Sequence, residues 1–474
     1  MLNDKNPRQI AARILSQRLN SGEFTENLLE TALATSRLSA ADRGLCHELV
    51  CGVVRWQATL DCLIARKADP ARQQRPALIN LLRLGLYQIF WLDRIPPHAA
   101  VHETVELAKR SGYGSQAGFI NAVLRGYLRE SDEIKKILAD MKTSQPALGW
   151  SHPEWLVEKW RKQFGDEKTR QLLAWNNTPP KTFARVNTLK FSSPLPEGDQ
   201  PTTTNHALAA PKRSDGGVPI THPSQGHDTP SAAEFKDAGD LLTRWREEDV
   251  EYDFFTRDWT GENLAFELKS HPPLARLGSF RDGWFYVQDP STLLAPVLLD
   301  AQPGETILDL CAAPGGKTTF IAQLLNDQGK IVANDLDPKR LKLVKDNCAR
   351  LGVTCVDLTS AAANERFDRI LVDAPCSNTG VLRRRVDLRW RIQAAEIERL
   401  RATQLELLNE AATKLVAGGV LVYSTCSLEP EENSDVVKQF LAGHAGFRLE
   451  TERQLLPFAD GADGAYVARL KHLP

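Results

Sequence analysis

The stretch GETILDLCAAPGGKTT, residues 304–319, decides the fold of this chain. Residues 307–310 form a short apolar run of the kind found in buried strands, and apolar residues at helical spacing follow from Phe320. Between them stands the pair Gly315-Gly316, which permits backbone angles and a close approach of a ligand that a Cβ atom would prevent. A strand, a glycine turn and a helix in this order predict an open α/β sheet with a nucleotide-type site at its first crossover.

The residue that follows the next predicted strand narrows the class of ligand. The letters GGKTT suggest a phosphate-binding P-loop, but that motif needs a glycine where Cys311 stands. Residues 331–333 form a second apolar strand that ends in Asn334-Asp335. A carboxylate about twenty residues after the glycine turn is placed to bind the hydroxyl groups of a ribose. This arrangement suits NAD or S-adenosylmethionine and leaves both open.

Bulk properties exclude several classes of protein. At 474 residues the chain exceeds one ordinary domain, and 42% hydrophobic with 25% charged residues is typical of globular proteins. The net charge of -1 does not indicate a nucleic-acid partner, although residues 1–130 hold 17 Lys and Arg against 12 Asp and Glu. The eight cysteines form no CxxC pair, which argues against a zinc site or a disulfide framework. We expect a cytoplasmic monomer without a metal, and no membrane segment.

The pattern along the chain predicts three domains and an insert. Residues 1–140 are expected to form a helical bundle around a central helix at 78–89, which Pro96-Pro97 should end. Residues 146–290 are expected to form a small α+β domain with strands at 182–187 and 284–289, and residues 291–474 the α/β domain. Within the second domain, residues 192–238 are rich in Pro, Thr, Ser and Gly. Such a segment cannot bury enough apolar surface to fold, so we predict a disordered insert.

Two cysteines directly follow predicted strands of the last domain. The strand at 369–373 leads into Pro375-Cys376-Ser377, and the strand at 420–423, after a turn at Gly418-Gly419, leads into Thr425-Cys426-Ser427. Ligands of open parallel sheets bind beyond the carboxyl ends of the strands. We therefore expect the residues at these ends to converge on one crevice: Cys311, Asp335, Asp373, Cys376 and Cys426. Buried cysteines are usually inert, and we interpret Cys311 in this way.

Thiols beside a nucleoside-type cofactor suit one particular chemistry. Carbon 5 of a pyrimidine is a poor nucleophile until a thiolate adds to carbon 6. It can then attack an electrophilic methyl group, after which a base removes the carbon 5 proton and the thiolate leaves. A strand-to-helix turn favours the thiolate form, and a carboxyl group such as that of Asp373 can hold the polar edge of the base.

Three motifs in order carry a family resemblance. CAAPGGKTT (311–319), DAPCSNTGV (373–381) and STCSLEPEENS (424–434) resemble the RNA 5-methylcytosine methyltransferases. RIPPHAAVHETVELAK (94–109) and FINAVLR (119–125) resemble the NusB-like RNA-binding domain of a bacterial branch that acts on small-subunit ribosomal RNA. The resemblance implies a NusB-like helical bundle, a small RNA-contacting α+β domain and a Rossmann-like methyltransferase domain that uses S-adenosylmethionine.

The resemblance also implies roles for individual residues. Cys426 is the expected nucleophile that forms a covalent adduct with carbon 6 of a cytosine in 16S rRNA, and Cys376 assists release of the product. Asp373 is expected to contact the cytosine or the cofactor. The target must be unstacked, because carbon 6 cannot be attacked inside a helix. The residues expected to hold S-adenosylmethionine are Cys311, Ala312, Ala313, Pro314, Gly315, Gly316, Lys317, Asp335, Asp357 and Asp373.

The sequence departs from the family pattern in two motifs and leaves other functions open. Val356-Asp357 stands where the family usually has a Gly-Asp pair, and Arg385-Val386-Asp387 replaces a His-Pro-Asp in a loop expected to face RNA. The same chemistry on transfer RNA or at another rRNA position is one alternative. A non-catalytic RNA-binding assembly factor is another, and the presence of both Cys376 and Cys426 argues against it.

Overall fold

The computed structural model describes residues 6–67, 75–191, 239–358 and 365–474. The segment predicted to be a disordered insert therefore lies outside the described residues. The chain forms two compact units: the first contains the chain up to Pro180 with Ala374–Glu410 and Tyr423–Ala468, and the second contains Lys181–Asp373, Ala411–Val422 and Arg469–Pro474. Among the described helices, none has the length and apolar character needed to cross a bilayer.

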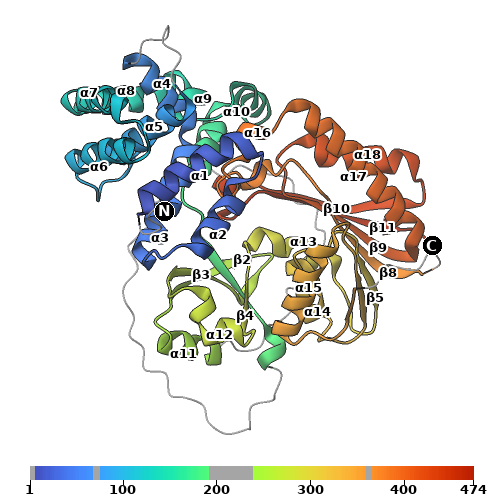
Figure 1. The fold of residues 1–474 in the computed structure, drawn as a ribbon. Coiled ribbons are helices and arrows are strands. Elements are labelled where there is room, and N and C mark those ends of the chain that lie inside the picture. The colour runs from blue at the N-terminus through green and yellow to red at the C-terminus, as the bar shows by residue number, and fades with distance from the viewer. Residues whose placement is uncertain (1–5, 68–74, 192–238, 359–364) are drawn as a thin grey trace, which may run out of the picture. The chain divides into compact units, whose positions relative to one another are not determined.

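The first unit begins with the predicted helical bundle (Figure 1). Helix α5 packs against α1, α3, α4, α6 and α7, so it is the central helix that its apolar sequence predicts. The expectation that Pro96-Pro97 ends this helix was wrong, because α5 already ends at Trp91 and Pro97 begins α6, where a missing N–H costs nothing. The helices are α1 Pro7–Ser21, α2 Thr25–Thr35, α3 Ala40–Arg55, α4 Gln57–Lys67, α5 Pro76–Trp91, α6 Pro97–Arg110, α7 Ala117–Arg129, α8 Ser131–Ser144, α9 Pro146–Gly149 and α10 Glu154–Asn176.

The second unit begins with a four-stranded antiparallel sheet in the order β2-β3-β1-β4. Trp245 of the helix α11 packs its ring 5.5 Å from that of Phe266 and 5.4 Å from that of Phe285, which closes a small core on one face. The sequence predicted the first and last of these strands but neither of the other two. The elements are β1 Thr182–Val186, α11 Gly239–Glu247, β2 Glu251–Arg257, β3 Gly261–Ser270, α12 Gly278–Arg281 and β4 Phe285–Val287.

A seven-stranded sheet follows in the order β10-β11-β9-β8-β5-β6-β7. Strand β5 pairs in parallel with β6 and with β8, so the ends of these three strands reach the same edge. Helix α14 packs against α15 and β6 (Figure 1). The elements are α13 Leu294–Leu299, β5 Thr306–Asp309, α14 Gly316–Leu324, β6 Lys330–Ala333, α15 Pro338–Leu351, β7 Val356–Asp357, β8 Phe367–Asp373, α16 Leu388–Arg391, α17 Ala394–Lys414, β9 Leu415–Thr425, α18 Ser434–Gly443, β10 Phe447–Leu455, α19 Pro457–Asp460 and β11 Ala465–His472.

Two local predictions in this sheet were wrong. The strand expected at 353–356 is displaced to β7, which is only two residues long. The turn expected at Gly418-Gly419 is part of β9, which begins directly after α17 ends. A Cβ atom on Gly419 would lie 2.9 Å from the carbonyl oxygen of Asp368, so the glycine allows a close approach of two backbones rather than a turn.

Candidate active site

The glycine turn between β5 and α14 has the backbone shape that its sequence predicts. Gly315 has a φ of +101°, and a Cβ atom there would also lie 3.2 Å from the Cα atom of Val344 in α15. A Cβ atom on Gly316 would lie 3.1 Å from the Tyr286 ring. Both positions therefore exclude a larger side chain, and the turn stays open for a ligand that approaches the backbone closely.

Arg185 of β1 holds this turn through hydrogen bonds to the start of α14, a role that the sequence did not predict. Its buried guanidinium donates to the carbonyl oxygen of Gly316 at 2.6 Å and to the hydroxyl oxygen of Thr319 at 3.0 Å. The guanidinium carbon lies 5.3 Å from the centre of the Tyr286 ring and 5.0 Å from that of Phe320. Burial lowers the pKa of Arg185 to about 9. The available signal was a single arginine inside an otherwise apolar strand.

Four of the predicted residues gather around the turn. The buried carboxylate of Asp335 accepts from the backbone N–H of Ala313 at 3.2 Å, which ties the end of β6 to the turn. The ammonium group of Lys317 lies 2.6 Å from a carboxylate oxygen of Asp373 at the end of β8. Burial, followed by the charges of Asp373, Asp309 and Asp335, raises the pKa of Cys311 to about 12. Cys311 therefore remains a neutral thiol and is no nucleophile at neutral pH.

Asp357 is the last residue of β7, the strand beside β6. The residue is level with Val332 in the parallel pairing of β6 and β7, and its carboxylate lies 3.7 Å from the ammonium group of Lys330 at the start of β6. Asp335 follows the other end of β6 by two residues. The structure therefore brings Cys311, Asp335 and Asp373 together, while the adenine contact expected of Asp357 stays a prediction.

Asp309 is a further acid of this site that the sequence reading did not single out. It is the last residue of β5 and is completely buried, and one carboxylate oxygen accepts from the hydroxyl of Thr318 at 2.7 Å. The other oxygen has no hydrogen-bond partner among the described residues. Burial raises the pKa of Asp309 to about 7. An unpaired buried oxygen behind the glycine turn fits a site whose polar ligand completes the hydrogen bonding.

Asp309→Asn should therefore remove a pH dependence of stability. The unfolded carboxyl ionises near pH 4, whereas the folded one holds its proton until about pH 7, so the wild-type protein loses stability as pH rises through this interval. We expect the difference in free energy of unfolding, Asp309→Asn minus wild type, to increase between pH 4 and pH 8. The increase should be at most on the order of 4 kcal/mol. Urea unfolding at several pH values measures this, with Asp346→Asn on the exposed face of α15 as the control. A difference that does not change with pH would contradict the assignment.

The two cysteine motifs meet in the first unit. Cys376 stands three residues after the end of β8, and Cys426 directly follows β9. Their sulfur atoms lie 3.3 Å apart. The hydrogen bond with Cys426, together with burial, raises the pKa of Cys376 well above its usual range. Cys376 therefore keeps its proton at neutral pH, while Cys426 is half-buried beside it.

Glu432 joins the two loops that carry the sulfur atoms, and sequence reasoning missed its role. Its buried carboxylate accepts from the backbone N–H of Ser377 at 2.8 Å and from the hydroxyl groups of both Ser377 and Ser427. Each serine directly follows one of the cysteines. Gly380 adds a second connection, because its N–H donates to the carbonyl oxygen of Cys426 at 2.9 Å and a Cβ atom there would lie 2.7 Å from the same oxygen.

Helix α10 holds the segment that follows Cys426. The indole N–H of Trp160 donates to Glu429 at 3.0 Å, and the amide of Gln163 donates to the carbonyl oxygen of Leu428 at 2.8 Å. Lys159 pairs with Glu431. This segment is therefore anchored along its length to one side of a long helix, which limits the positions that Cys426 can take.

Two residues of the motif 385–387 are buried and Arg385 is exposed, while the expectation that its loop faces RNA stays a prediction. Val386 is buried in the apolar core of the helical bundle, and the buried Asp387 accepts from the guanidinium of Arg18 and from the backbone N–H of Thr25. Residues 386 and 387, where the sequence departs from the family pattern, therefore pack inside the first unit. They join the segment after Cys376 to helices α1 and α2.

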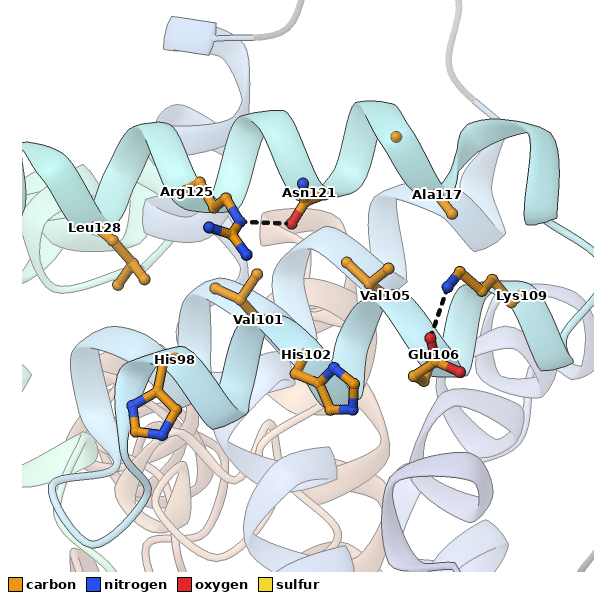
Figure 2. A pocket seen from close by; sticks show the side chains of 11 residues that line it. His98, Val101, His102, Val105, Glu106, Lys109, Ala117, Asn121, Arg125 and Leu128 are labelled. Carbon is orange, nitrogen blue, oxygen red and sulfur yellow. Dashed lines mark hydrogen bonds and ion pairs between the residues drawn. The ribbon is translucent and has the colours of Figure 1, made fainter.

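A groove of about 470 Å³ lies between α6 and α7 in the helical bundle. Figure 2 shows Arg125 of α7 bonded to Asn121 at 2.9 Å, and Lys109 of α6 paired with Glu106 at 2.7 Å. Val101 is part of the apolar lining. Arg125 belongs to the motif FINAVLR, so this groove is the place where the structure puts the polar side chains of that motif.

The glycine turn at 315–316 lies at the first crossover of a largely parallel sheet and is bonded to the carboxylate of Asp335. Together with the cysteine motifs at 375–377 and 425–427, this turn defines a Rossmann-like methyltransferase. Models of protein families agree. The model described as 16S rRNA methyltransferase RsmB/F matches residues 296–471, and that of the NusB family matches residues 5–129. The ferredoxin-like domain of RsmF/B-like methyltransferases matches residues 152–194.

Relatives over the full length identify the family. A probable ribosomal RNA small subunit methyltransferase B of Synechocystis is 36% identical over 98% of this chain and 99% of its own. That of Bacillus subtilis is 32% identical over 98% of both chains, and ribosomal RNA small subunit methyltransferase B of Shigella sonnei is 33% identical over 99% of both. The chain belongs to the ribosomal RNA small subunit methyltransferase B family, which confirms the resemblance predicted from its motifs.

Solved structures confirm the fold. The crystal structure of PH0851 superposes with a TM-score of 0.70 over 98% of each chain at 23% identity. A methyltransferase homolog protein from Pyrococcus horikoshii gives a TM-score of 0.53 at 26% identity, over 69% of this chain and 97% of its own. Together, family membership and fold support methyl transfer to ribosomal RNA with S-adenosylmethionine as the donor.

Proposed function

We propose that this protein methylates carbon 5 of an unstacked cytosine in 16S rRNA, with S-adenosylmethionine as the methyl donor. The observation that carries the proposal is the pair of sulfur atoms of Cys376 and Cys426, 3.3 Å apart on loops tied together by one buried carboxylate. A single inert cysteine needs no partner, whereas addition to carbon 6 and release of the product need one nucleophile and one group that handles protons.

Each residue of the pair has a distinct task in the proposed reaction. Cys426 loses its proton and its sulfur bonds to carbon 6, which moves an electron pair to carbon 5. The bound donor supplies an electrophilic methyl group to that carbon. A base then removes the proton from carbon 5, the double bond between carbons 5 and 6 forms again, and the bond from carbon 6 to sulfur breaks. Cys376, held neutral by its raised pKa, can return a proton to the departing sulfur.

The residues around the glycine turn suit the donor. Gly315 and Gly316 leave the backbone open, Asp335 offers a carboxylate for the ribose hydroxyls, and Asp309 holds an unpaired buried oxygen. Leu336, directly after Asp335, is 99% exposed. An apolar side chain left in water beside the ribose carboxylate is a natural support for the adenine ring, and the sequence reading missed it.

RNA recognition is assigned to the domains outside the methyltransferase fold. The groove beside Arg125 presents cationic and polar side chains from α6 and α7, the helices that carry the two NusB-like motifs. Methylation of transfer RNA or of another rRNA position would use the same cysteines. A non-catalytic assembly factor is less well supported, because Ser377, Ser427 and Glu432 converge on the loops of two thiols that such a factor has no reason to align.

Bisulfite sequencing of 16S rRNA incubated with the full chain and S-adenosylmethionine tests the function. We expect one cytosine to become resistant to conversion. Asp335→Ala should lose most of this activity, because the ribose hydroxyls lose their carboxylate partner and the donor binds more weakly. Asp337→Ala removes a carboxylate two residues away and serves as the matched control. Equal donor affinity of wild type and Asp335→Ala in calorimetry would contradict the cofactor site, and resistant cytosines only in transfer RNA would move the substrate assignment.

A further inference from the structure

Asn378 contacts both cysteines of the pair. It stands two residues after Cys376 and has a φ of +59°, in the left-handed region that non-glycine residues rarely adopt. Its side-chain amide nitrogen donates to the carbonyl oxygen of Cys376 at 2.6 Å. Its amide oxygen accepts from the thiol of Cys426 at 2.9 Å.

These contacts determine which acceptor each of the two thiol protons, on Cys376 and Cys426, is directed toward. A backbone carbonyl can only accept, so the amide nitrogen of Asn378 must point toward Cys376 and the amide oxygen toward Cys426. The single proton of the Cys426 thiol is then used in the bond to Asn378. The contact between the sulfur atoms is left to the proton of Cys376, which is the thiol that burial and this hydrogen bond keep protonated.

We infer that Asn378 is a positioning residue that binds the proton of Cys426 and holds the nucleophile as an unreactive thiol until substrate RNA displaces the contact. The inference rests on the proposed function, because it takes Cys426 as the nucleophile. An amide oxygen cannot take up the proton at neutral pH, and it would repel the thiolate if it stayed in place. Attack on carbon 6 therefore requires the bond between Cys426 and Asn378 to break, or the amide to turn its N–H groups toward the sulfur.

Two substitutions separate this role from simple packing. Asn378→Gly deletes the amide, and glycine accepts the positive φ without strain, so the loop can keep its path. Asn378→Asp keeps the size and shape of the side chain but accepts more strongly from the thiol and repels a thiolate. If Asn378 only fills space, both variants loosen the loop and change the reactivity of Cys426 in the same direction. If it holds the proton, the two variants act in opposite directions.

Alkylation by iodoacetamide in the RNA-free full chain provides the measurement. The thiolate displaces iodide and the proton passes to the buffer, so the rate follows the availability of the Cys426 thiolate. Mass spectrometry of the Cys426 peptide, with Cys62 of α4 as the internal control, should show roughly tenfold faster labelling for Asn378→Gly, the size of one hydrogen bond. At the same pH, the Cys426 peptide of Asn378→Asp should be labelled more slowly than that of wild type.

Other outcomes would overturn the inference. Unchanged labelling in Asn378→Gly, or a change of the labelling rate in the same direction for both variants, would show that Asn378 does not control the proton of Cys426. These experiments contain no RNA, so their outcome is independent of the proposed reaction. Failure of the proposed function would appear instead as a wild-type protein that leaves every cytosine unmethylated while the two variants still differ in alkylation.

Discussion

Cys426→Ser is expected to abolish methyl transfer, while Cys376→Ser is expected to trap RNA on the protein. A serine hydroxyl stays protonated near neutral pH and is a far weaker nucleophile than a thiolate, so loss of the Cys426 sulfur removes the attack on carbon 6. Loss of the Cys376 thiol leaves that attack possible. It replaces the thiol that lies 3.3 Å from the departing sulfur with a hydroxyl, which is a much weaker acid, so the methylated cytosine should remain attached.

Denaturing gels of protein mixed with 16S rRNA and S-adenosylmethionine distinguish these outcomes. A slowly migrating band should form with Cys376→Ser and be absent from Cys426→Ser. The double variant is the control, because it keeps both substitutions but lacks the sulfur that forms the adduct. A band from Cys426→Ser alone would exchange the two roles, and its absence from both single variants would leave covalent catalysis without support.

Local sequence predicted the parts of the site that depend on short-range geometry. The glycine turn at 315–316 follows from a strand, two glycines and a helix within sixteen residues, and the structure shows why larger side chains are excluded there. The placement of Cys376 and Cys426 after two strands follows from the same kind of pattern. Their separation of 3.3 Å does not, because the two cysteines are fifty positions apart in the sequence and the pairing of their loops depends on tertiary contacts.

Residues that act through distant partners escaped the sequence reading. Arg185 belongs to the first strand of the small sheet, yet its guanidinium bonds to Gly316 more than a hundred residues later. Gly418-Gly419 looked like a turn because glycine pairs usually are one. In the structure the pair continues a strand, and a Cβ atom on Gly419 would meet the Leu415 side chain at 2.7 Å and the carbonyl oxygen of Asp368 on the neighbouring strand at 2.9 Å. No local pattern contains such contacts.

The role of Glu432 was also not predicted, although the residue belongs to the motif STCSLEPEENS (424–434) that carries the family resemblance. An acidic residue in the polar segment 429–433 is indistinguishable from a solvated one by composition alone. The structure buries it completely and gives it three donors from the two cysteine loops. Burial raises the pKa of Glu432, while the hydrogen bonds from Ser377 and Ser427 oppose that shift.

Glu432→Ala should consequently impair both the fold and the reaction. Three buried donors, on Ser377 and Ser427, would lose their acceptor, and each unsatisfied group costs about 1–3 kcal/mol. Urea unfolding should therefore show a loss of several kcal/mol. Glu431→Ala is the matched control, because that carboxylate is partly exposed and pairs with Lys159, and its loss should cost less than about 1 kcal/mol.

Glu432→Gln tests whether the carboxylate aligns the two thiols in addition to stabilising the fold. In the wild type both serine hydroxyls donate to one carboxylate oxygen, and the backbone N–H of Ser377 donates to the other. The amide keeps only one oxygen, so its NH₂ group must face either the two hydroxyls or the N–H of Ser377, and we expect the loop of Ser377 to shift relative to that of Ser427. At a temperature where circular dichroism shows the variants to be folded, we expect Glu432→Gln combined with Cys376→Ser to form the RNA adduct through Cys426 more slowly than Cys376→Ser alone. Equal rates of adduct formation with and without Glu432→Gln would mean that the carboxylate stabilises the loops without setting the distance between the sulfur atoms. The backbone contact of Gly380 with Cys426 would then be sufficient to hold that distance.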